Sequence, residues 1–350
     1  MKYAKLGSSD LQVSEVCLGS MTWGQQNNQA DADAQLDYSI EQGINFIDTA
    51  EMYSVPPKAE TQGSTERIIG TWLAANPERR KDIVLATKIA GPGVPWVRNA
   101  GPITRATINE AVDNSLQRLH TDYIDLYQLH WPNRLSPHFS KHWPGVVDPT
   151  LVDADKERDG LLDILRGLDD VVKAGKVGHC GLSDDTPWGI MQYLALAKEH
   201  DLPRMVSIQN EFSLLHIKDH PYLIEACVFE DVAYLPWSPL AGGALSGKYA
   251  NGAKPEGARW TMQQRNGIFR DTAFSHDAIA AYQTVAEKHG MTVTQMSLAW
   301  VYQFAGVTST IIGATSMEQL KEDIGAYSMT LSEDVIKDID AVIRRYPVPF

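Results

Sequence analysis

The stretch that most clearly indicates the fold is Tyr123-Ile124-Asp125-Leu126-Tyr127-Gln128-Leu129-His130, a mostly apolar run that ends in one polar ring. A run of this length, rich in aromatic and branched residues, is typical of a strand buried on both faces. In parallel sheets and barrels the carboxyl ends of the strands carry the chemistry. His130 therefore stands where a functional side chain is expected.

Two earlier predicted strands end in the same manner. Strand 45–48 ends on Asp48, with Tyr53 five residues later, and strand 83–88 ends on Lys88. Because the carboxyl ends of parallel strands meet at one edge, we expect a carboxylate, a phenol, an ammonium and an imidazole to converge there. This convergence is the main candidate site in the sequence.

The chain alternates between predicted strands and helices, after a small hairpin over residues 3–13. The strands are expected at 16–19, 45–48, 83–88, 123–130, 177–182, 205–209, 232–236 and 308–312. The helices are expected from 30 to Gly43 and at 64–75, 105–119, 159–174, 187–199, 220–229, 276–289, 294–304, 316–326 and 332–345. Such alternation implies parallel pairing through right-handed crossovers.

Eight strand–helix units over roughly 250 residues or more predict an α/β protein with a (β/α)₈ TIM barrel. We expect one domain over residues 1–350, with the N-terminal hairpin and a C-terminal helix added to the barrel. A doubly wound sheet is the alternative fold. That fold usually has G-x-G-x-x-G after its first strand, whereas this chain has Ser20-Met21-Thr22-Trp23-Gly24.

Composition and charge narrow the class of protein. The 350 residues are 43% hydrophobic and 21% charged, which is ordinary for a globular chain, and the formal charge is -13. An acidic balance disfavours nucleic acid and anionic membranes as partners. Three distant cysteines, Cys17, Cys180 and Cys227, suit a reducing compartment. Without a signal-like N-terminus or a membrane-length apolar run, we expect a cytoplasmic monomer or homo-oligomer.

Two long loops leave the predicted catalytic end, at residues 89–103 and 131–158. Loops of more than about 12 residues are usually functional or disordered, and aromatic content argues against disorder. We therefore expect both loops to form pocket walls. The tryptophans of the loops at this end predict an apolar, aromatic-lined substrate pocket, and they are Trp23, Trp96, Trp131 and Trp143.

The four strand-end groups suit the protonation of an oxygen atom. A phenol has an ordinary pKa of about 10, and a neighbouring ammonium lowers that pKa by stabilising the anion. Lys88, held by Asp48, is placed to do this for Tyr53, and His130 is placed to orient a carbonyl oxygen. No side chain supplies a hydride, so a nicotinamide cofactor is implied.

With these residues in place, the sequence resembles the aldo-keto reductase superfamily. The resemblance runs from the first hairpin to the last helix and is closest to the bacterial Tas-like branch. It is carried by Asp48-Thr49-Ala50-Glu51-Met52-Tyr53, Lys88, Leu129-His130-Trp131-Pro132, Gly181-Leu182-Ser183, Gln209-Asn210-Glu211-Phe212-Ser213-Leu214, Trp237-Ser238-Pro239-Leu240-Ala241-Gly242-Gly243 and Ile312-Gly313-Ala314-Thr315. The branch is indicated by Met21-Thr22-Trp23-Gly24-Gln25-Gln26-Asn27 and by Val55-Pro56-Pro57 after Tyr53.

The resemblance implies a reductase of aldehydes or ketones that binds NADPH across the barrel mouth. Tyr53 would be the general acid, and Asp48, Lys88 and His130 would complete a catalytic tetrad. Ser183 and Gln209 would hold the nicotinamide carboxamide, with Trp237 stacked on the ring. The other implied cofactor contacts are Gly19, Thr22, Trp23, Ser238, Pro239, Leu240, Gly242, Lys248, Gly313, Thr315, Gln319 and Asp323. The implied substrate contacts are Trp23, Tyr53, His130 and Trp131.

The chain departs from the family pattern at two points. Asp184 follows Ser183 where members usually have Asn, and a carboxylate cannot donate a hydrogen bond as Asn does. No Arg lies between Gly313 and Gln319, so Arg259, and after it Lys321, is the candidate for the 2′-phosphate of NADP. NAD is the less favoured cofactor.

Gly242 to Tyr249 matches the G-x-x-x-x-G-K part of a P-loop. Tyr249 then stands where Ser or Thr would bind Mg²⁺, so a P-loop nucleotide hydrolase is disfavoured. The glycines and Lys248 remain candidates for a phosphate contact.

Two other functions stay open. Some proteins with this resemblance are ancillary channel subunits that sense the cofactor and turn over poorly, and retained tetrad residues do not exclude that role. A metal-dependent barrel hydrolase or isomerase would use His130, His138 and His142. No further ligand is evident beside the His138 and His142 pair, so we expect no metal.

Taken singly, Asp48 and Lys88 would also suit a structural ion pair. Together with Tyr53 and His130 at the same strand ends, they favour a functional site.

Overall fold

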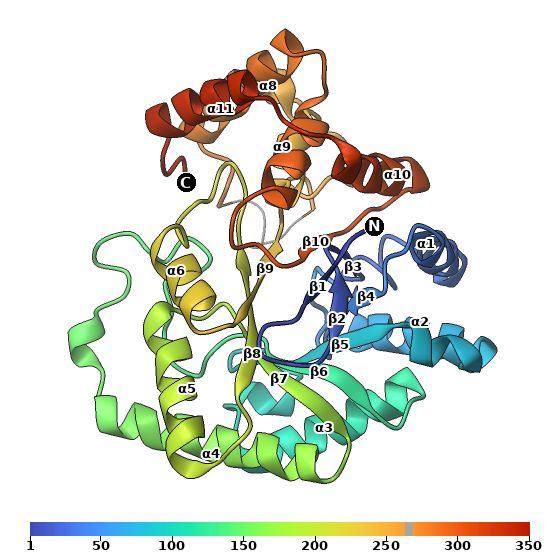
Figure 1. The fold of residues 1–350 in the computed structure, drawn as a ribbon, viewed down its shortest axis with the longest axis vertical. Coiled ribbons are helices and arrows are strands. Elements are labelled where there is room, and N and C mark those ends of the chain that lie inside the picture. Colours follow the sequence, from blue (N-terminus) through green and yellow to red (C-terminus); the bar gives the residue numbers. More distant parts are fainter. Residues whose placement is uncertain (263–268) are drawn as a thin grey trace.

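The predicted strands form a parallel barrel in the computed structural model, which describes residues 1–262 and 269–350 (Figure 1). The strands are β3 (Val16–Gly19), β4 (Phe46–Asp48), β5 (Val84–Ile89), β6 (Ile124–Leu129), β7 (Val177–Ser183), β8 (Met205–Glu211), β9 (Ala233–Trp237) and β10 (Thr310–Ile312). They pair in the order β10-β3-β4-β5-β6-β7-β8-β9. A parallel bridge between Tyr234 and Val307 joins the two ends, with Thr308 N donating to Tyr234 O at 2.9 Å. The (β/α)₈ barrel is therefore confirmed.

Helices surround the barrel, and several of them begin at residues whose side chains cap the helix N-terminus. They are α1 (Gln29–Glu41), α2 (Ser64–Ala75), α3 (Arg105–Leu119), α4 (Ala154–Lys173), α5 (Pro187–His200), α6 (Tyr222–Phe229), α8 (Ala273–Lys288), α9 (Val293–Tyr302), α10 (Met317–Gly325) and α11 (Glu333–Arg345). Shorter 3₁₀ turns lie at Ala59–Thr61, Pro77–Asp82, Arg98–Ala100, Pro149–Leu151, Ala241–Ser246, Ala250–Gly252 and Ala326–Ser328. Reciprocal capping boxes begin α1 at Asn28, α3 at Thr104 and α9 at Thr292.

The main correction to the predicted elements is the start of α4. The helix was expected from 159 and begins at Ala154. Asp153 caps it by accepting hydrogen bonds from the backbone N–H groups of Asp155 and Lys156, at 3.2 and 3.1 Å. The acidic residues that follow favour a helix N-terminus because of the helix dipole. The charged run is thus part of the helix, and the long loop before it is shorter than predicted.

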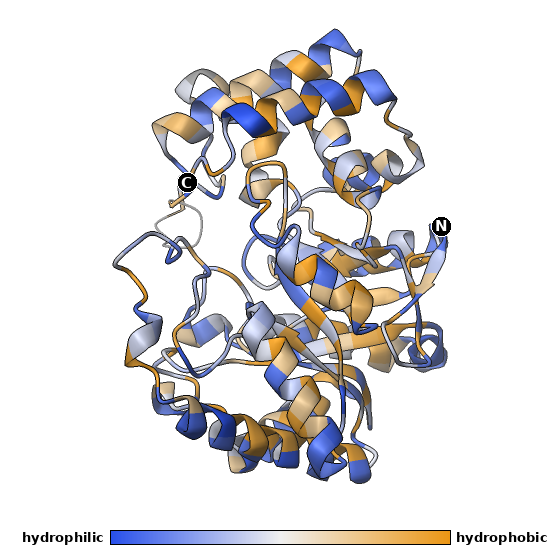
Figure 2. Cartoon of the chain, turned by 60° about the vertical axis from the view of Figure 1, so that its left-hand side comes forward, coloured by the Kyte–Doolittle hydropathy of each residue, from blue (hydrophilic) through white to orange (hydrophobic). Residues whose placement is uncertain are grey.

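The core lies between the helices and the barrel, where apolar helix faces meet the strands (Figure 2). On α4, Leu161, Ile164, Leu165, Leu168 and Val171 are buried, at the spacing of one helix face. Full burial of such a side chain contributes roughly 1.5–3 kcal/mol. This packing holds the strands, and hence the residues at their ends, in fixed positions.

The N-terminal hairpin covers the amino end of the barrel. Strands β1 (Tyr3–Lys5) and β2 (Gln12–Ser14) pair antiparallel. Leu6, in the turn, is fully buried in one cluster with Phe46, Leu126 and Val206 from the strands. At Gly7 a Cβ atom would stand 2.2 Å from the Val206 carbonyl oxygen, so only glycine fits there. The accessible end of the barrel is therefore the carboxyl end.

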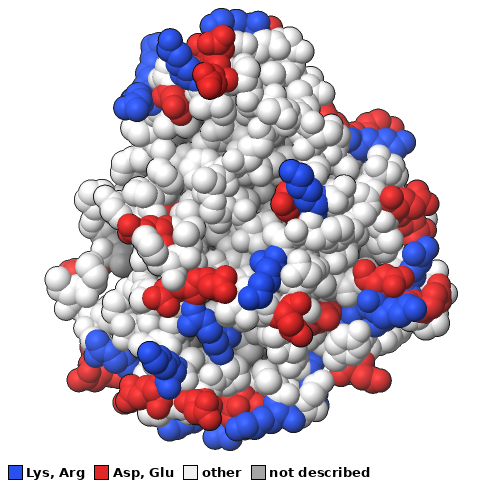
Figure 3. Space-filling view, in the orientation of Figure 1, with Lys and Arg blue, Asp and Glu red and all other residues white. Residues whose placement is uncertain are grey.

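Charges of both signs are interspersed over the face shown in Figure 3, where Lys and Arg lie beside Asp and Glu. The cysteine thiols at 17, 180 and 227 are buried and unpaired. Within the described ranges, none of the helices combines the length and the apolar composition needed to span a bilayer.

Candidate active site

The structure brings the four predicted tetrad residues together at the carboxyl ends of β4, β5 and β6. Lys88 Nζ donates to Asp48 Oδ2 at 2.5 Å and to the Thr49 carbonyl at 2.9 Å, and the pair is buried. The same ammonium lies 5.0 Å from the centre of the Tyr53 ring. The Tyr53 hydroxyl lies 3.4 Å from His130 Nε2, and the two rings meet edge to face. A phenol therefore faces an imidazole above a buried ion pair.

The electrostatics of these groups are set by burial and by Lys88. Burial raises the pKa of Tyr53, and Lys88 only partly offsets that rise, so the net lowering expected from the sequence is absent in the protein alone. Burial opposes the charged form of Lys88, but Asp48 and Tyr53 outweigh it and raise the pKa of Lys88. Burial holds the pKa of His130 well below its usual value, and the positive charge of Lys88 adds a smaller effect in the same direction. The site thus presents a neutral phenol, a neutral imidazole and an ammonium–carboxylate pair.

Sequence reasoning missed Gln128. Its Nε2 donates to Asp48 Oδ1 at 3.2 Å, and Gln209 Nε2 donates to the same oxygen at 3.0 Å and to Gln128 Oε1 at 3.1 Å. The signal was available, because Gln128 precedes His130 by two residues and alternate residues of a strand share a face. Gln209, expected at the carboxamide, has its amide nitrogen bound to Asp48, and Ser183 lies opposite Gln209 in the β7–β8 pairing.

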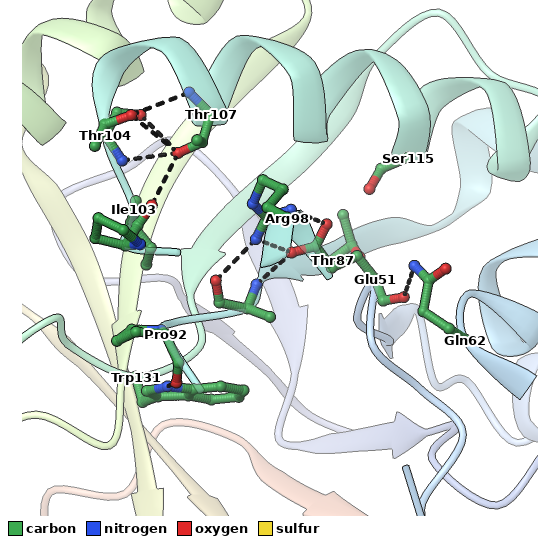
Figure 4. A network of polar contacts seen from close by, with 12 residues as sticks. Glu51, Gln62, Thr87, Pro92, Arg98, Ile103, Thr104, Thr107, Ser115 and Trp131 are labelled. Atoms are coloured by element: carbon green, nitrogen blue, oxygen red, sulfur yellow. Dashed lines mark hydrogen bonds and ion pairs between the residues drawn. The ribbon is translucent and has the colours of Figure 1, made fainter. Parts of the chain in front are cut away.

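One wall of the mouth is the segment between β5 and α3 (Figure 4). Trp131 lies beside His130, with ring centres 4.9 Å apart, and its indole N–H donates to the Pro92 carbonyl at 3.0 Å. Arg98 holds this segment by two hydrogen bonds to Glu51, at 2.7 and 2.6 Å, and one to the Ala90 carbonyl. Trp131, on the loop after β6, therefore lies beside His130 and against the segment that Arg98 holds.

Trp23 lies elsewhere, contrary to its predicted place in the pocket. Its side chain is fully buried in the main core cluster, and its indole N–H donates to Gln35 on α1 at 3.0 Å. The Trp23 ring therefore exposes no surface to the mouth in this structure, because α1 supplies the polar partner that turns the ring inward. Contact between Trp23 and a ligand stays a prediction.

The opposite wall comes from the long loop after β6. Phe139 stacks on Trp237, with ring centres 5.8 Å apart, and Trp237 is half-buried at the end of β9. His138 Nε2 lies 3.1 Å from the Asp185 carbonyl and anchors the loop. The indole N–H of Trp237 donates to Asp184 Oδ1 at 3.2 Å. Trp237 is therefore covered by an aromatic residue of the loop, and its place beneath a nicotinamide stays a prediction.

A positively charged turn follows Trp237. Ser238, Pro239 and Leu240 lead into Gly242 and Gly243, whose φ angles are 66° and 90°. A Cβ on Gly243 would stand 2.7 Å from Lys248 Nζ, and one on Gly242 would stand 3.8 Å from Arg259 Cγ.

Both cations are half-buried, and in the part of the chain that the structure describes neither pairs with a carboxylate. Burial, then Arg270, lowers the pKa of Arg259 to about 10. Burial and Arg259 lower the pKa of Lys248. Cations left uncompensated around a backbone turn are typical of a phosphate site.

The predicted adenosine end lies at the start of α10. The Thr315 N–H and hydroxyl both donate to Gln319 Oε1, at 2.9 and 3.0 Å. Asp323 is buried, and burial, then Glu322, raises its pKa to about 8. The exposed Gly313 follows β10, and a Cβ on Gly19 would stand 2.9 Å from the Ile312 carbonyl.

The loop after β3 joins this end to the charged turn. Asn27 donates to the Thr315 carbonyl at 3.0 Å and accepts from the Thr22 hydroxyl at 2.9 Å. Gln26 donates to the Gly257 carbonyl at 3.1 Å. Lys321 lies against Tyr38, with Nζ 5.7 Å from the ring centre. The cofactor residues predicted at the ends of β3, β9 and β10 thus lie on connected loops, with Arg259 at the glycine turn.

The three histidines of the metal-dependent alternative make separate contacts. His130 faces Tyr53, His138 contacts the Asp185 carbonyl, and both ring nitrogens of His142 lie within 2.9 Å of Lys218 Nζ. Among residues 1–262 and 269–350, no three His, Cys, Asp or Glu side chains are grouped as metal ligands would be.

Comparisons with known proteins agree with this geometry. The Aldo/keto reductase family profile matches residues 15–344. The chain is 45% identical over 354 residues to the Protein tas of Escherichia coli K12, and equally to that of Shigella flexneri, with both chains covered completely. It is 29% identical to the uncharacterized oxidoreductase YrpG of Bacillus subtilis, over 98% of this chain and 96% of that one. With a tetrad at the barrel mouth and a family match over nearly its whole length, the chain belongs to the aldo/keto reductase family and is an oxidoreductase.

Proposed function

We propose that the protein reduces small aldehydes or ketones to alcohols with NADPH. The observation that carries this proposal is the Tyr53 hydroxyl, which lies 3.4 Å from His130 Nε2 while its ring lies over the buried Lys88–Asp48 pair. A carbonyl oxygen held between phenol and imidazole would meet two hydrogen-bond partners. As negative charge builds on that oxygen, Tyr53 donates its proton, and Lys88 stabilises the phenolate that remains.

The residues present fit the cofactor. Lys248 and Arg259, which have no carboxylate partner among the described residues, place positive charge at the glycine turn, which suits a diphosphate. Trp237, stacked with Phe139 in this structure, is the proposed nicotinamide platform. NADPH, when bound, supplies the hydride that no side chain can. Arg259, and after it Lys321, is the proposed partner of the 2′-phosphate, the group by which NADPH differs from NADH. The substrate would contact Tyr53, His130 and Trp131, and we propose no nucleic-acid or membrane partner.

The test is the Tyr53→Phe variant, assayed by NADPH fluorescence titration and then with a panel of aromatic aldehydes. We expect NADPH affinity within about twofold of wild type and a kcat lower by roughly 10²–10⁴-fold, the usual contribution of a general acid. Tyr127→Phe is the matched control, because the Tyr127 hydroxyl is buried without a hydrogen-bond partner among the described residues. A Tyr53→Phe enzyme that turns over normally would refute the assignment.

The same titration addresses the alternative, a cofactor-sensing subunit. Tight NADPH binding with negligible turnover by the wild type on every carbonyl tested would favour sensing. No binding of NADPH or NADH would remove both proposals.

A further inference from the structure

Two adjacent acids follow β7, and the structure gives them opposite surroundings. Asp184 and Asp185 are both buried. The Arg134 guanidinium contacts both oxygens of Asp185, so this acid is paired as a carboxylate. In the described residues, no lysine or arginine forms an ion pair with Asp184. A buried carboxylate without a cation is costly, and such a group normally keeps its proton.

The imidazole of His138, beside Asp184, cannot supply the missing positive charge. His138 Nδ1 lies 3.8 Å from Asp184 Oδ1, while His138 Nε2 lies 3.1 Å from the Asp185 carbonyl. A carbonyl oxygen only accepts, so the hydrogen of the imidazole is on Nε2. Burial lowers the pKa of His138, so the ring is neutral and Nδ1 presents a lone pair to Asp184. His138 therefore neither donates a hydrogen bond to Asp184 nor supplies a positive charge beside it.

On balance, the other groups around Asp184 also favour its neutral form. Burial, followed by the nearby Glu211 carboxylate, raises the pKa of Asp184 well above its usual range. Asp219 adds to this rise, whereas the hydrogen bond from Trp237 and the charge of Lys88 oppose it. Glu211 is itself paired with Arg270. The neutral form of Asp184 is therefore consistent with its geometry and with the charges on every element packed against it.

The two oxygens of Asp184 differ in their contacts. Oδ1 accepts the indole N–H of Trp237 at 3.2 Å, which places the carboxyl group at the edge of the aromatic platform. No hydrogen bond within the described part of the chain engages Oδ2. The backbone N–H of Asp184 donates to the Gln209 carbonyl at 3.1 Å and keeps the carboxyl group beside Ser183 and Gln209.

We propose that Asp184 is a neutral carboxylic acid that donates its O–H to the carboxamide oxygen of a nicotinamide stacked on Trp237. The inference rests on the proposed function, because it assumes that a nicotinamide occupies the platform. It gives an acid the donor role of an amide. Nucleotide affinity then depends on one proton, since the ionised form has no donor and sets a negative charge against the carboxamide oxygen.

The first test is NADPH fluorescence titration from about pH 6 to pH 10, with wild type, D184N and D219N. We expect wild-type affinity to fall by about tenfold or more at alkaline pH, the loss of one hydrogen bond and the gain of a repulsion. D184N should bind at every pH and lack this transition. D219N is the matched control, because burial raises the pKa of Asp219 to about 7 but this acid bonds to Tyr234 and not to Trp237.

Tyr53, Lys88, His138 and Lys218 are present in all three proteins, so the comparison between the proteins cancels the contribution of their titration to the pH profile. Parallel pH profiles for wild type and D184N would overturn the inference and leave NADPH binding intact. A wild type that binds neither NADPH nor NADH would overturn the proposed function, and the inference with it.

A second measurement needs no bound ligand. The infrared difference spectrum between wild type and D184N at pH 7 should contain the carbonyl stretch of a protonated carboxyl group, and absence of that band would contradict the neutral acid.

If D184N does not fold, the thionicotinamide analogue of NADPH serves as the probe of the wild type. Sulfur accepts hydrogen bonds weakly, so we expect weaker binding at pH 7 and a smaller alkaline loss than for NADPH. Identical profiles for the two nucleotides would overturn the inference.

Discussion

Gln209 Nε2 lies 3.0 Å from Asp48 Oδ1, the carboxylate oxygen that Lys88 does not use. Gln128 donates to the same oxygen, so the two oxygens of Asp48 are divided between one ammonium and two amides. A buried carboxylate fixed by three donors cannot rotate away from Lys88, and the ammonium stays beneath Tyr53. The position of the proposed proton donor thus depends on residues from β6 and β8 that do not touch the substrate.

Gln128→Met should therefore lower turnover without removing the tetrad. Loss of one hydrogen bond to a charged group costs roughly 1.5–3 kcal/mol, and if half of it appears in the transition state, kcat falls by about 3–10-fold. NADPH affinity should stay within about twofold. Gln283→Met is the control, because Gln283 makes the same amide-to-carboxylate bond to Glu287 on an exposed surface. A shifted pH–rate profile for Gln128→Met, and an unchanged one for the control, would distinguish positioning from a general loss of stability.

Lys248→Met should weaken NADPH binding by about 10–100-fold, because it removes one of two cations at the glycine turn that have no carboxylate partner among the described residues. The salt dependence of binding should also become shallower, since fewer charges meet the phosphates. Lys254→Met provides the comparison, because the Lys254 ammonium is exposed and paired with Asp271 at 3.0 Å. Equal NADPH affinity for wild type and Lys248→Met would show that the turn does not bind the diphosphate.

Arg98→Met should destabilise the protein more than Arg105→Met. Arg98 and Glu51 have side chains 11% and 3% exposed, whereas Arg105 and Asp170 are 52% and 32% exposed. Removing one partner of a buried pair costs about 3–5 kcal/mol, against about 0–1 kcal/mol for an exposed pair. Urea unfolding measures both. Similar losses for the two variants would mean that burial of the Glu51–Arg98 pair has no energetic effect.

Acid should destabilise the fold through His216. Burial lowers the pKa of this ring to about 4, compared with 6.5 in an unfolded chain. The unfolded state then binds the extra proton first, so this contribution to stability is complete above pH 6.5 and is lost as the pH falls toward 4. The loss is at most about 3 kcal/mol. His216→Gln should flatten the pH dependence of urea unfolding over this range, while the exposed His200→Gln should not; matching slopes would contradict the prediction.

Much of the fold follows from the sequence, because each β/α unit has its own signals. Buried apolar strands, helix caps and Gly or Asp turns are local features, and the barrel is the arrangement that satisfies all of them. The start of α4 was misplaced, because Asp153 caps a helix that begins at Ala154 and not at 159.

The tetrad could also be located from local signals, since its members lie at the ends of successive strands. The contacts around the tetrad could not be predicted in this way. Trp23 and Trp131 are both loop tryptophans in the sequence, and only the position of Gln35 on α1 and of the Pro92 carbonyl decides which one turns inward. The state of Asp184 depends on a ring 46 positions earlier in the chain, whose tautomer is set by the neighbouring Asp185 carbonyl. Such tertiary partners leave no mark in a local pattern.

The hairpin at the amino end has a kinetic consequence. Leu6 and the strand side chains around it fill the interior of the barrel at that end, so among the described residues the tetrad is approached from the carboxyl end. In the proposed reaction, an alcohol formed at Tyr53 would leave by the route along which the next carbonyl compound arrives. Arrival and departure therefore exclude one another, and product is expected to compete with substrate for the same passage.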